Sequence, residues 1–159
     1  MSTPPSAPRI IRKSIAYITQ RGRILFFRAD EAPDQGAELP GGTLHPAEDP
    51  VEGLRREILE ETGFADIGTP HLLGVVEFDP GSELNEVHHR HFYHVALEAT
   101  APETWSRIVE EGNGTFTFRF FWAAPDALPS KVYPGHDVFV AEVGGLLEGA
   151  LWEDAQPDG

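Results

Sequence analysis

The stretch from Gly42 to Phe64 constrains this chain more than any other part of its sequence. It reads GTLHPAEDPVEGLRREILEETGF and predicts a helix between a start signal and a stop signal. Asp49 is a favoured N-cap residue, Pro50 suits the first helical position, and Gly63 favours the end of a helix. Apolar residues recur on one side of the helix, so we expect that side to lie on a hydrophobic core.

Three glutamates of this helix, Glu57, Glu60 and Glu61, are spaced so that they share one face. Like charges at this spacing repel one another, and a hard divalent cation removes the repulsion because it prefers carboxylate oxygens. Arg56 lies close enough along the helix to hold a carboxylate in place. The alternative is a solvated acidic face, which is the usual meaning of a charge run taken alone. The complete pattern favours the metal site.

The stretch resembles the signature of the Nudix hydrolases at all of its fixed positions. These positions are Gly42, Glu48, Arg56, Glu57, Ile58, Glu60, Glu61, Gly63 and Phe64. A weaker likeness extends from about Arg12 to Trp152. The resemblance implies an α/β fold, the α/β/α sandwich with a mixed β-sheet of that family. It also implies an enzyme in which water attacks a diphosphate, with Mg²⁺ (or Mn²⁺) as the cofactor.

The resemblance also assigns roles by position. It implies that Glu57, Glu60 and Glu61 are metal ligands, with the carbonyl oxygen of Gly42 as another. Arg56 would orient a metal-binding glutamate, and Glu48 would anchor the loop before the helix.

One more acid from outside the signature is expected at the metal site. The candidates are Glu98, Glu103, Glu110 and Glu111. Glu111 is preferred because related sequences often place a catalytic Glu-Gly pair before a late strand, and Gly112 follows it here. Glu111 would be a metal ligand or the base that deprotonates the attacking water. Glu110 is the second choice, and an exposed loop acid is the alternative.

Two further sites outside the signature are candidates for substrate binding. Arg90 lies in the run from His88 to His94, where one strand face is expected to line the substrate cleft. An ordinary packed or solvated sheet face is an equal alternative. A zinc site at His89 and His91 is disfavoured because the chain has no cysteine to complete a tetrahedral set. Arg28 ends a strand and could reach a phosphate, or it could be an ordinary strand-end arginine.

Apolar alternation predicts the remaining elements. Strands are expected at 10–18, 23–28, 72–78, 87–97 and 115–122, and a helix at 135–152. Residues 102–114 are expected to form a turn-rich or short helical connection. The predicted organisation is a single domain over 9–152, with a disordered tail at 1–8 and an acidic tail at 153–159.

Composition narrows the partners and the location. A net charge of −14, from 12 basic and 26 acidic residues, disfavours nucleic-acid polymers and anionic membranes. A small nucleotide substrate that arrives with its metal fits this charge better. The absence of cysteine excludes disulfides and a cysteine nucleophile. No signal-like or membrane-spanning run is visible, so a cytoplasmic location is expected. The oligomeric state is open, a homodimer included.

The substrate is the least determined property. Pro80 lies sixteen positions beyond Phe64, where ADP-ribose hydrolases of this family tend to carry a proline. This slightly favours an ADP-ribose or nucleotide-sugar substrate. The alternatives are a nucleoside triphosphate pyrophosphatase that clears damaged nucleotides and a catalytically silent nucleotide-sensing domain.

Overall fold

A computed structural model of the chain describes residues 6–112 and 114–155. These residues form a seven-stranded mixed sheet in the order β4-β5-β1-β2-β7-β6, with β3 paired to β1 off this path. The strands are β1 (Arg9–Gln20), β2 (Arg23–Ala29), β3 (Gly41–Thr43), β4 (His71–Phe78), β5 (Glu86–Ala96), β6 (Thr104–Glu111) and β7 (Gly114–Ala123). The helices are α1 (Pro50–Thr62) and α2 (Val140–Ala155), with short 3-10 turns η1 (Pro33–Gln35) and η2 (Ser82–Leu84).

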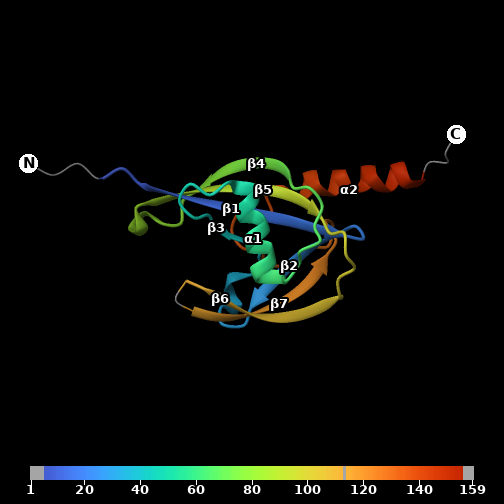
Figure 1. Ribbon diagram of the computed structural model, residues 1–159, viewed down its shortest axis with the longest axis horizontal. Helices are drawn as coiled ribbons and strands as arrows, with labels where there is room; N and C mark the ends of the chain where they lie inside the picture. Colours follow the sequence, from blue (N-terminus) through green and yellow to red (C-terminus); the bar gives the residue numbers. More distant parts are fainter. Residues whose placement is uncertain (1–5, 113, 156–159) are drawn as a thin grey trace, which may run out of the picture.

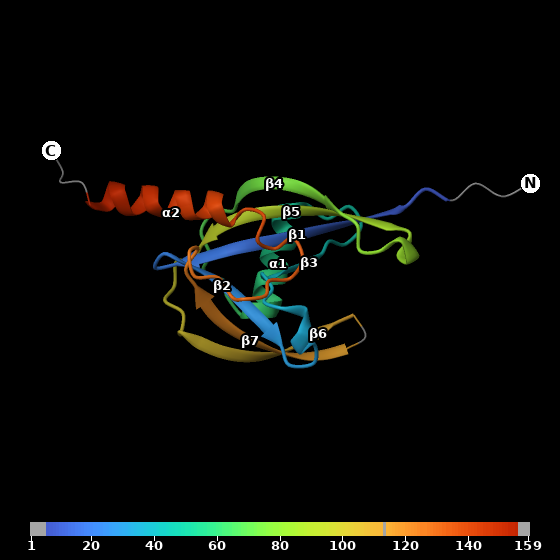
Figure 2. The same cartoon turned by 180° about the vertical axis from the view of Figure 1, so that it is seen from behind.

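The sheet opens into two halves because β1 and β2 pair only next to their connecting turn. Their register covers Thr19↔Ile24 and Gln20↔Arg23, and beyond these residues the two strands separate. The freed part of β1 pairs instead with β3, at Lys13–Ile15. Figures 1 and 2 show the two halves diverging, with β4, β5 and β1 on one side and β2, β7 and β6 on the other. The split leaves room for a cavity beside β3.

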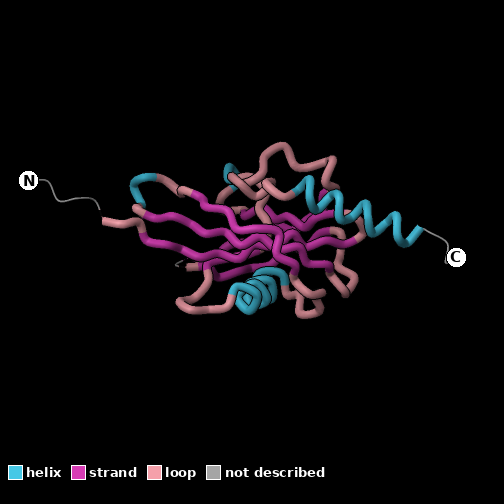
Figure 3. Tube along the Cα trace, turned by 90° about the horizontal axis from the view of Figure 1, so that it is seen from above, coloured by secondary structure: helices cyan, strands magenta, loops and turns pink. Residues whose placement is uncertain are grey.

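Alternation along β1 divides the core into two layers. Ala16 and Ile18 pack with Leu54 and Ile58 of α1. Ile15 and Tyr17 face the other way, toward Phe92, Val140 and Val143. Figure 3 shows α1 and α2 on opposite sides of the sheet. The predicted α/β/α sandwich with a mixed sheet is therefore confirmed; only the β1–β5 pair is parallel among the named strand pairs of the described residues.

Helix α1 begins and ends where its sequence predicts. The Asp49 carboxylate accepts hydrogen bonds from the backbone N–H groups of Val51 (3.0 Å) and Glu52 (3.1 Å). Gly63 ends the helix in the left-handed conformation, with φ of 85°. A residue with a side chain is disfavoured at this φ, so glycine sets the stop.

Residues 102–114 do not form the turn-rich or short helical connection that the sequence predicted. Most of this segment is the edge strand β6. Pro102, Gly112 and Gly114 bracket this strand and suggested turns. The residues between them are strand formers whose partners lie elsewhere in the sequence. The Trp105 ring stacks on that of Phe120, 4.8 Å between centroids, and Val109 is buried in the core.

At the two chain ends, the structure contradicts only the C-terminal expectation. The expected disordered tail at 1–8 falls partly on residues 1–5, which lie outside the described residues, and β1 begins at Arg9. Helix α2 starts later than predicted and continues to Ala155, into the segment expected as an acidic tail. No helix among the described residues is long and apolar enough to cross a membrane.

Candidate active site

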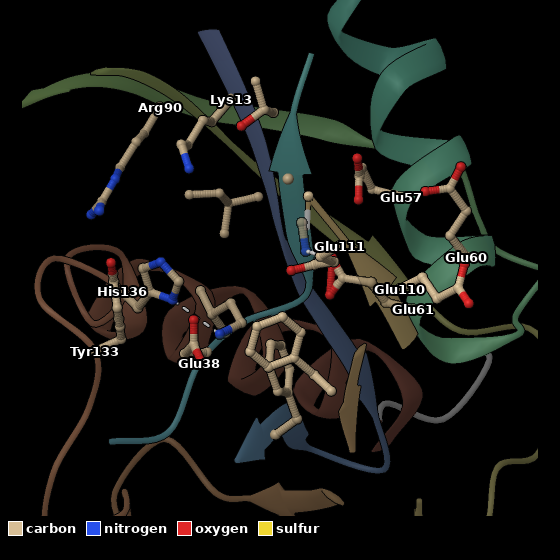
Figure 4. Close-up of a pocket in the computed structure, with 18 residues that line it drawn as sticks. Lys13, Glu38, Glu57, Glu60, Glu61, Arg90, Glu110, Glu111, Tyr133 and His136 are labelled. Carbon is tan, nitrogen blue, oxygen red and sulfur yellow. Dashed lines mark hydrogen bonds between the residues drawn. The ribbon is translucent and has the colours of Figure 1, made fainter. Parts of the chain in front are cut away.

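A cavity of about 550 Å³ lies beside β3, where the two halves of the sheet separate. Its lining divides into two groups of charged and polar side chains (Figure 4). We call one group the acidic pole, which consists of Glu57, Glu60, Glu61, Glu110 and Glu111. We call the other the cationic pole, which consists of Lys13, Arg90, Tyr133 and His136. Glu38 lies near the cationic pole.

Glu57 and Glu61 are the buried acids of the cavity. Their residues are only 8% and 1% exposed. The Gly41 backbone N–H donates to Glu61 Oε1 at 3.2 Å, while the buried Glu61 Oε2 has no partner among the described residues. The Glu57 carboxylate packs on Gly42, where an added Cβ would lie 2.4 Å from Glu57 Cδ. Gly42 therefore lets the β3 backbone approach the Glu57 carboxylate, whereas Gly41 lets it approach β1, where an added Cβ would lie 2.3 Å from the Ser14 carbonyl oxygen.

Glu111 joins these two acids from the end of β6. Glu57, Glu61 and Glu111 each offer an oxygen atom, and the three atoms lie within 4.8 Å of one another. Burial raises the pKa of Glu61 well above its usual value, and repulsion from Glu111 and Glu57 adds to the effect. Loss of water and repulsion from Glu57 likewise raise the pKa of Glu111. Such a cluster favours either bound protons or a divalent cation, so these residues fit the implied metal.

Glu60 and Glu110 lie at the rim of the same cavity. Both line it, but neither belongs to the group of three converging carboxylates. The Glu60 side chain is 55% exposed, and its carboxylate lies 3.4 Å from Arg56 Nη1. The role of Glu60 as a metal ligand and the carbonyl of Gly42 as another therefore stay predictions. Glu98 and Glu103 lie outside the lining, and Glu103 pairs with Arg23.

Arg56 and Glu48 clamp the loop that precedes α1 to the helix. Arg56 Nε and Nη2 donate to the two Glu48 oxygens at 3.0 and 2.9 Å, a bidentate arrangement. The remaining Glu48 lone pairs accept from the His45 backbone N–H at 3.0 Å. The Arg56 hydrogen bonds, with that of His45, lower the pKa of Glu48 to about 2. Arg56 Nη1 also donates to Glu57 Oε1 at 2.8 Å, so the clamp orients one acid of the cluster.

Replacing Arg56 with Lys is expected to lower the free energy of unfolding by about 1–3 kcal/mol, because a lysine cannot form the bidentate contact. It should also weaken metal binding through the loss of the bond to Glu57. Chemical denaturation and metal titration measure the two effects. Arg55→Lys is the matched control, since Arg55 is the exposed neighbour on the same helix. Equal stability of the two variants would contradict the clamp.

The cationic pole is assembled by sheet register. Lys13 of β1 and Arg90 of β5 occupy directly paired positions of the parallel strands, so both project from the same face. Tyr133 and His136 reach the cavity from the segment before α2 (Figure 4). The sequence prediction included Arg90 but missed Lys13, Glu38, Tyr133 and His136. Lys13 had one available signal, because alternation places it on the same strand face as Ile11, Ile15 and Tyr17.

Arg28 and the histidines between His88 and His94 do not line the cavity that holds the two poles. Arg28 lies outside the cavity, with its guanidinium 4.4 Å from the Phe121 ring centroid. It borders a second hollow on the outer face of β2, β7 and β6. His91 Nδ1 lies 3.1 Å from the Lys13 carbonyl, and His89 Nε2 lies 3.3 Å from a Glu77 oxygen. The described residues contain no metal-like cluster at these histidines.

A family comparison accounts for this arrangement. Residues 11–143 match the model of the NUDIX domain family. The chain belongs to the Nudix family. The signature between Gly42 and Phe64 thus lies within a complete Nudix fold, and the chain is a Nudix pyrophosphohydrolase. Enzymes of this family act on small nucleotide substrates and generally use divalent metal ions.

Solved structures show the same fold. A MutT Nudix hydrolase from Burkholderia pseudomallei is 26% identical, with a TM-score of 0.65, over 85% of this chain and 98% of that one. A UDP-X diphosphatase is 19% identical, with a TM-score of 0.59, over 97% and 67%. An ADP-ribose pyrophosphatase from Streptococcus suis is 17% identical, with a TM-score of 0.56, over 88% and 91%. Comparison with curated proteins finds no match.

Proposed function

We propose that the protein is a Mg²⁺- or Mn²⁺-dependent hydrolase that cleaves the diphosphate linkage of a nucleoside diphosphate bound to another moiety. The observation that carries this proposal is the convergence of Glu57, Glu61 and Glu111 beside the Gly41-Gly42 backbone. Glu61 Oε2 is buried without a partner among the described residues, and burial in that state costs free energy unless a ligand binds there.

Each residue of the acidic pole has a proposed role. Glu57, Glu61 and Glu111 would hold the metal, with Glu60 and the Gly42 carbonyl as further ligands. When bound, the metal supplies charge neutralisation on the diphosphate oxygens and a lower pKa for water. Arg56 acts by positioning Glu57. Glu111 also suits the proton acceptor, because its carboxylate borders open cavity and its raised pKa lies closer to neutrality than that of a free glutamate.

The candidate substrates differ in the group that is attached to the nucleoside diphosphate. Pro80 favoured ADP-ribose or a nucleotide sugar, but this residue does not line the cavity. A nucleoside triphosphate pyrophosphatase gains support from the cationic pole, because Lys13 and Arg90 offer positive charge beyond the metal site. A silent nucleotide-sensing domain is disfavoured, since the acids of the signature are all retained. Arg90 is the proposed substrate-binding arginine, and Arg28 would need a substrate that extends to the second hollow.

A substrate panel tests the proposed function. Purified protein is expected to hydrolyse at least one of ADP-ribose, nucleotide sugars, nucleoside triphosphates and dinucleoside polyphosphates in the presence of Mg²⁺ or Mn²⁺. Activity should vanish with excess chelator and return when either metal is restored. Product identification by mass spectrometry with ¹⁸O-labelled water shows which phosphorus is attacked. Failure to cleave any of them, with intact nucleotide binding, would support the sensing domain instead.

A further inference from the structure

Two cations in the cavity have no carboxylate of the described residues within ion-pair distance. Lys13 and Arg90 occupy paired positions, yet neither forms an ion pair with any of the described residues. Elsewhere Arg23, Arg56 and Arg119 each pair with an acid. The chain has 26 acidic and 12 basic residues, so acids are not scarce. Two like charges held side by side without counterions oppose folding, unless a ligand compensates for them.

The fold holds Arg90 rigidly in this position. The residue is 3% exposed, and its guanidinium carbon lies 3.5 Å from the Phe78 ring centroid. Arg90 Nη1 donates to the Pro134 carbonyl at 2.7 Å. Its Nε is buried and has no partner among the described residues. Gly135 allows this packing, because a Cβ there would lie 2.7 Å from Arg90 Nη1. A buried cation without an acid partner is costly, and an anionic ligand beside the guanidinium would offset the cost of the charge.

His136 adds a neutral donor to the same place. The Leu39 backbone N–H donates to His136 Nδ1 at 3.0 Å, so the ring proton must be on Nε2. Burial, with the nearby charges of Arg90 and Lys13, lowers the pKa of His136 to about 3, which keeps the ring neutral. The Tyr17 hydroxyl fixes the segment by donating to the His136 carbonyl at 2.6 Å and accepting from the Phe139 N–H at 3.0 Å. The donor is therefore preorganised.

Lys13 lies between the two poles. Its side chain lines the same cavity as Arg90 and the acids of the acidic pole, and the charges of Arg90, Glu111, Glu38 and Glu57 all act on it (Figure 4). A group held by Lys13 and Arg90 can therefore be attached directly to a diphosphate held at the acidic pole. ADP-ribose and nucleotide sugars with neutral sugars carry no charge beyond the diphosphate. They would leave both cations without a partner.

We propose that Lys13, Arg90 and His136 form a phosphoryl subsite, which holds an additional phosphoryl group in line with the diphosphate at the acidic pole. The preferred substrates are then nucleotides with at least three consecutive phosphates, such as nucleoside triphosphates. A phosphoryl group is favoured over a carboxylate because it brings a larger negative charge to the two cations and offers three terminal oxygens, one for each donor. The choice of substrate rests on the proposed function, whereas anion binding at this subsite does not.

Binding of inorganic phosphate to the metal-free protein tests the subsite alone. Phosphate and tripolyphosphate are expected to bind in calorimetry and to raise the thermal midpoint. Because the acidic pole repels anions when no metal is bound, this binding reports on the subsite alone. Lys13→Met should weaken this binding about tenfold or more, through the loss of a charged donor. The variant should keep or exceed the thermal midpoint of the unliganded protein. Lys13→Arg should restore binding, and Arg55→Met is the control for the loss of one positive charge.

Steady-state kinetics test the substrate class. For a nucleoside triphosphate, Lys13→Met is expected to raise KM about tenfold or more while kcat changes less. For ADP-ribose, the same variant should change KM less than about twofold. Equal losses on both substrates would place Lys13 at the scissile diphosphate and overturn the separate subsite. Hydrolysis of ADP-ribose but not of nucleoside triphosphates by the wild type would also overturn it. If no substrate is cleaved, the proposed function fails, and phosphate binding still decides the subsite. Unchanged phosphate affinity in Lys13→Met would also overturn it.

Discussion

Glu61→Gln is expected to lower kcat/KM for metal-dependent hydrolysis by more than about 100-fold, because changes to residues that merely support a metal ligand already cost about 10–100-fold. Glu61 is 1% exposed, and one of its oxygens has no partner among the described residues. Glutamine has the same shape, and its amide oxygen can still accept from the Gly41 N–H. It removes the cost of burying or protonating a carboxylate at this position, so the metal-free variant should be more stable than the wild type.

A loss of activity together with a gain in stability distinguishes a metal ligand from a structural residue. Activity across a Mg²⁺ titration measures the loss of activity, and thermal unfolding in chelator measures the gain in stability. Glu52→Gln is the matched control, since Glu52 lies exposed in the first turn of α1 and does not line the cavity. Glu60→Gln extends the comparison, and a loss of activity there would support Glu60 as a further ligand. Turnover by Glu61→Gln at the wild-type level would remove the basis for the proposed metal site.

Sequence predicted α1 well because its determinants are local. The cap at Asp49 and the stop at Gly63 act within a few residues of the helix ends. Leu54 and Ile58 are both fully buried, as the apolar stripe indicated. The signature places Glu57 and Glu61 on one face of the helix, and Glu111 was found only through the family resemblance. Local spacing alone could not bring Glu111 to them, because β6 reaches the cavity through sheet pairing.

The grouping of residues in the cationic pole could not be predicted from local sequence for the same reason. Lys13 and Arg90 are distant in sequence and meet only because β1 and β5 pair in parallel in one particular register. His136 reaches the cavity through a hydrogen bond to Leu39, and nothing in its neighbouring residues indicates that contact. Arg28 shows the same limit of local reasoning. Its strand was predicted correctly, but the face on which its side chain lies depends on the pairing of β2 with β7.

The stability of the metal-free protein is expected to fall as the pH rises above about 6.5, which is opposite to the usual effect of paired carboxylates. Burial, with repulsion from Glu111, raises the pKa of Glu38 to about 7. Burial also raises the pKa of Glu57, and that of Glu61 lies well above its usual value. A carboxyl with a raised pKa keeps its proton in the folded chain after the unfolded chain has lost it. The folded state binds more protons, so raising the pH favours unfolding.

The pH window is set by the other titrating groups. His136 has a pKa lowered to about 3, so its effect has the opposite sign and ends near the ordinary histidine pKa of 6.5. Above that value the opposing effect of His136 is absent, and the raised pKa of Glu38, about 7, sets the remaining dependence. Thermal unfolding in chelator should therefore show a midpoint that decreases as the pH rises from about 6.5 through about 7.

Mg²⁺ should reverse this dependence, because it competes with protons for the same carboxylates and binds most tightly when they are ionised. At 100 times its Kd, a ligand that binds only the folded state adds about 2.7 kcal/mol to the free energy of unfolding. The stabilisation by Mg²⁺ should thus be larger at pH 8.5 than at pH 6.5. Glu61→Gln should flatten both responses, since it removes a buried acid whose pKa lies well above its usual value. A pH-independent midpoint in chelator, with a Mg²⁺ effect retained in Glu61→Gln, would mean that the metal is held elsewhere.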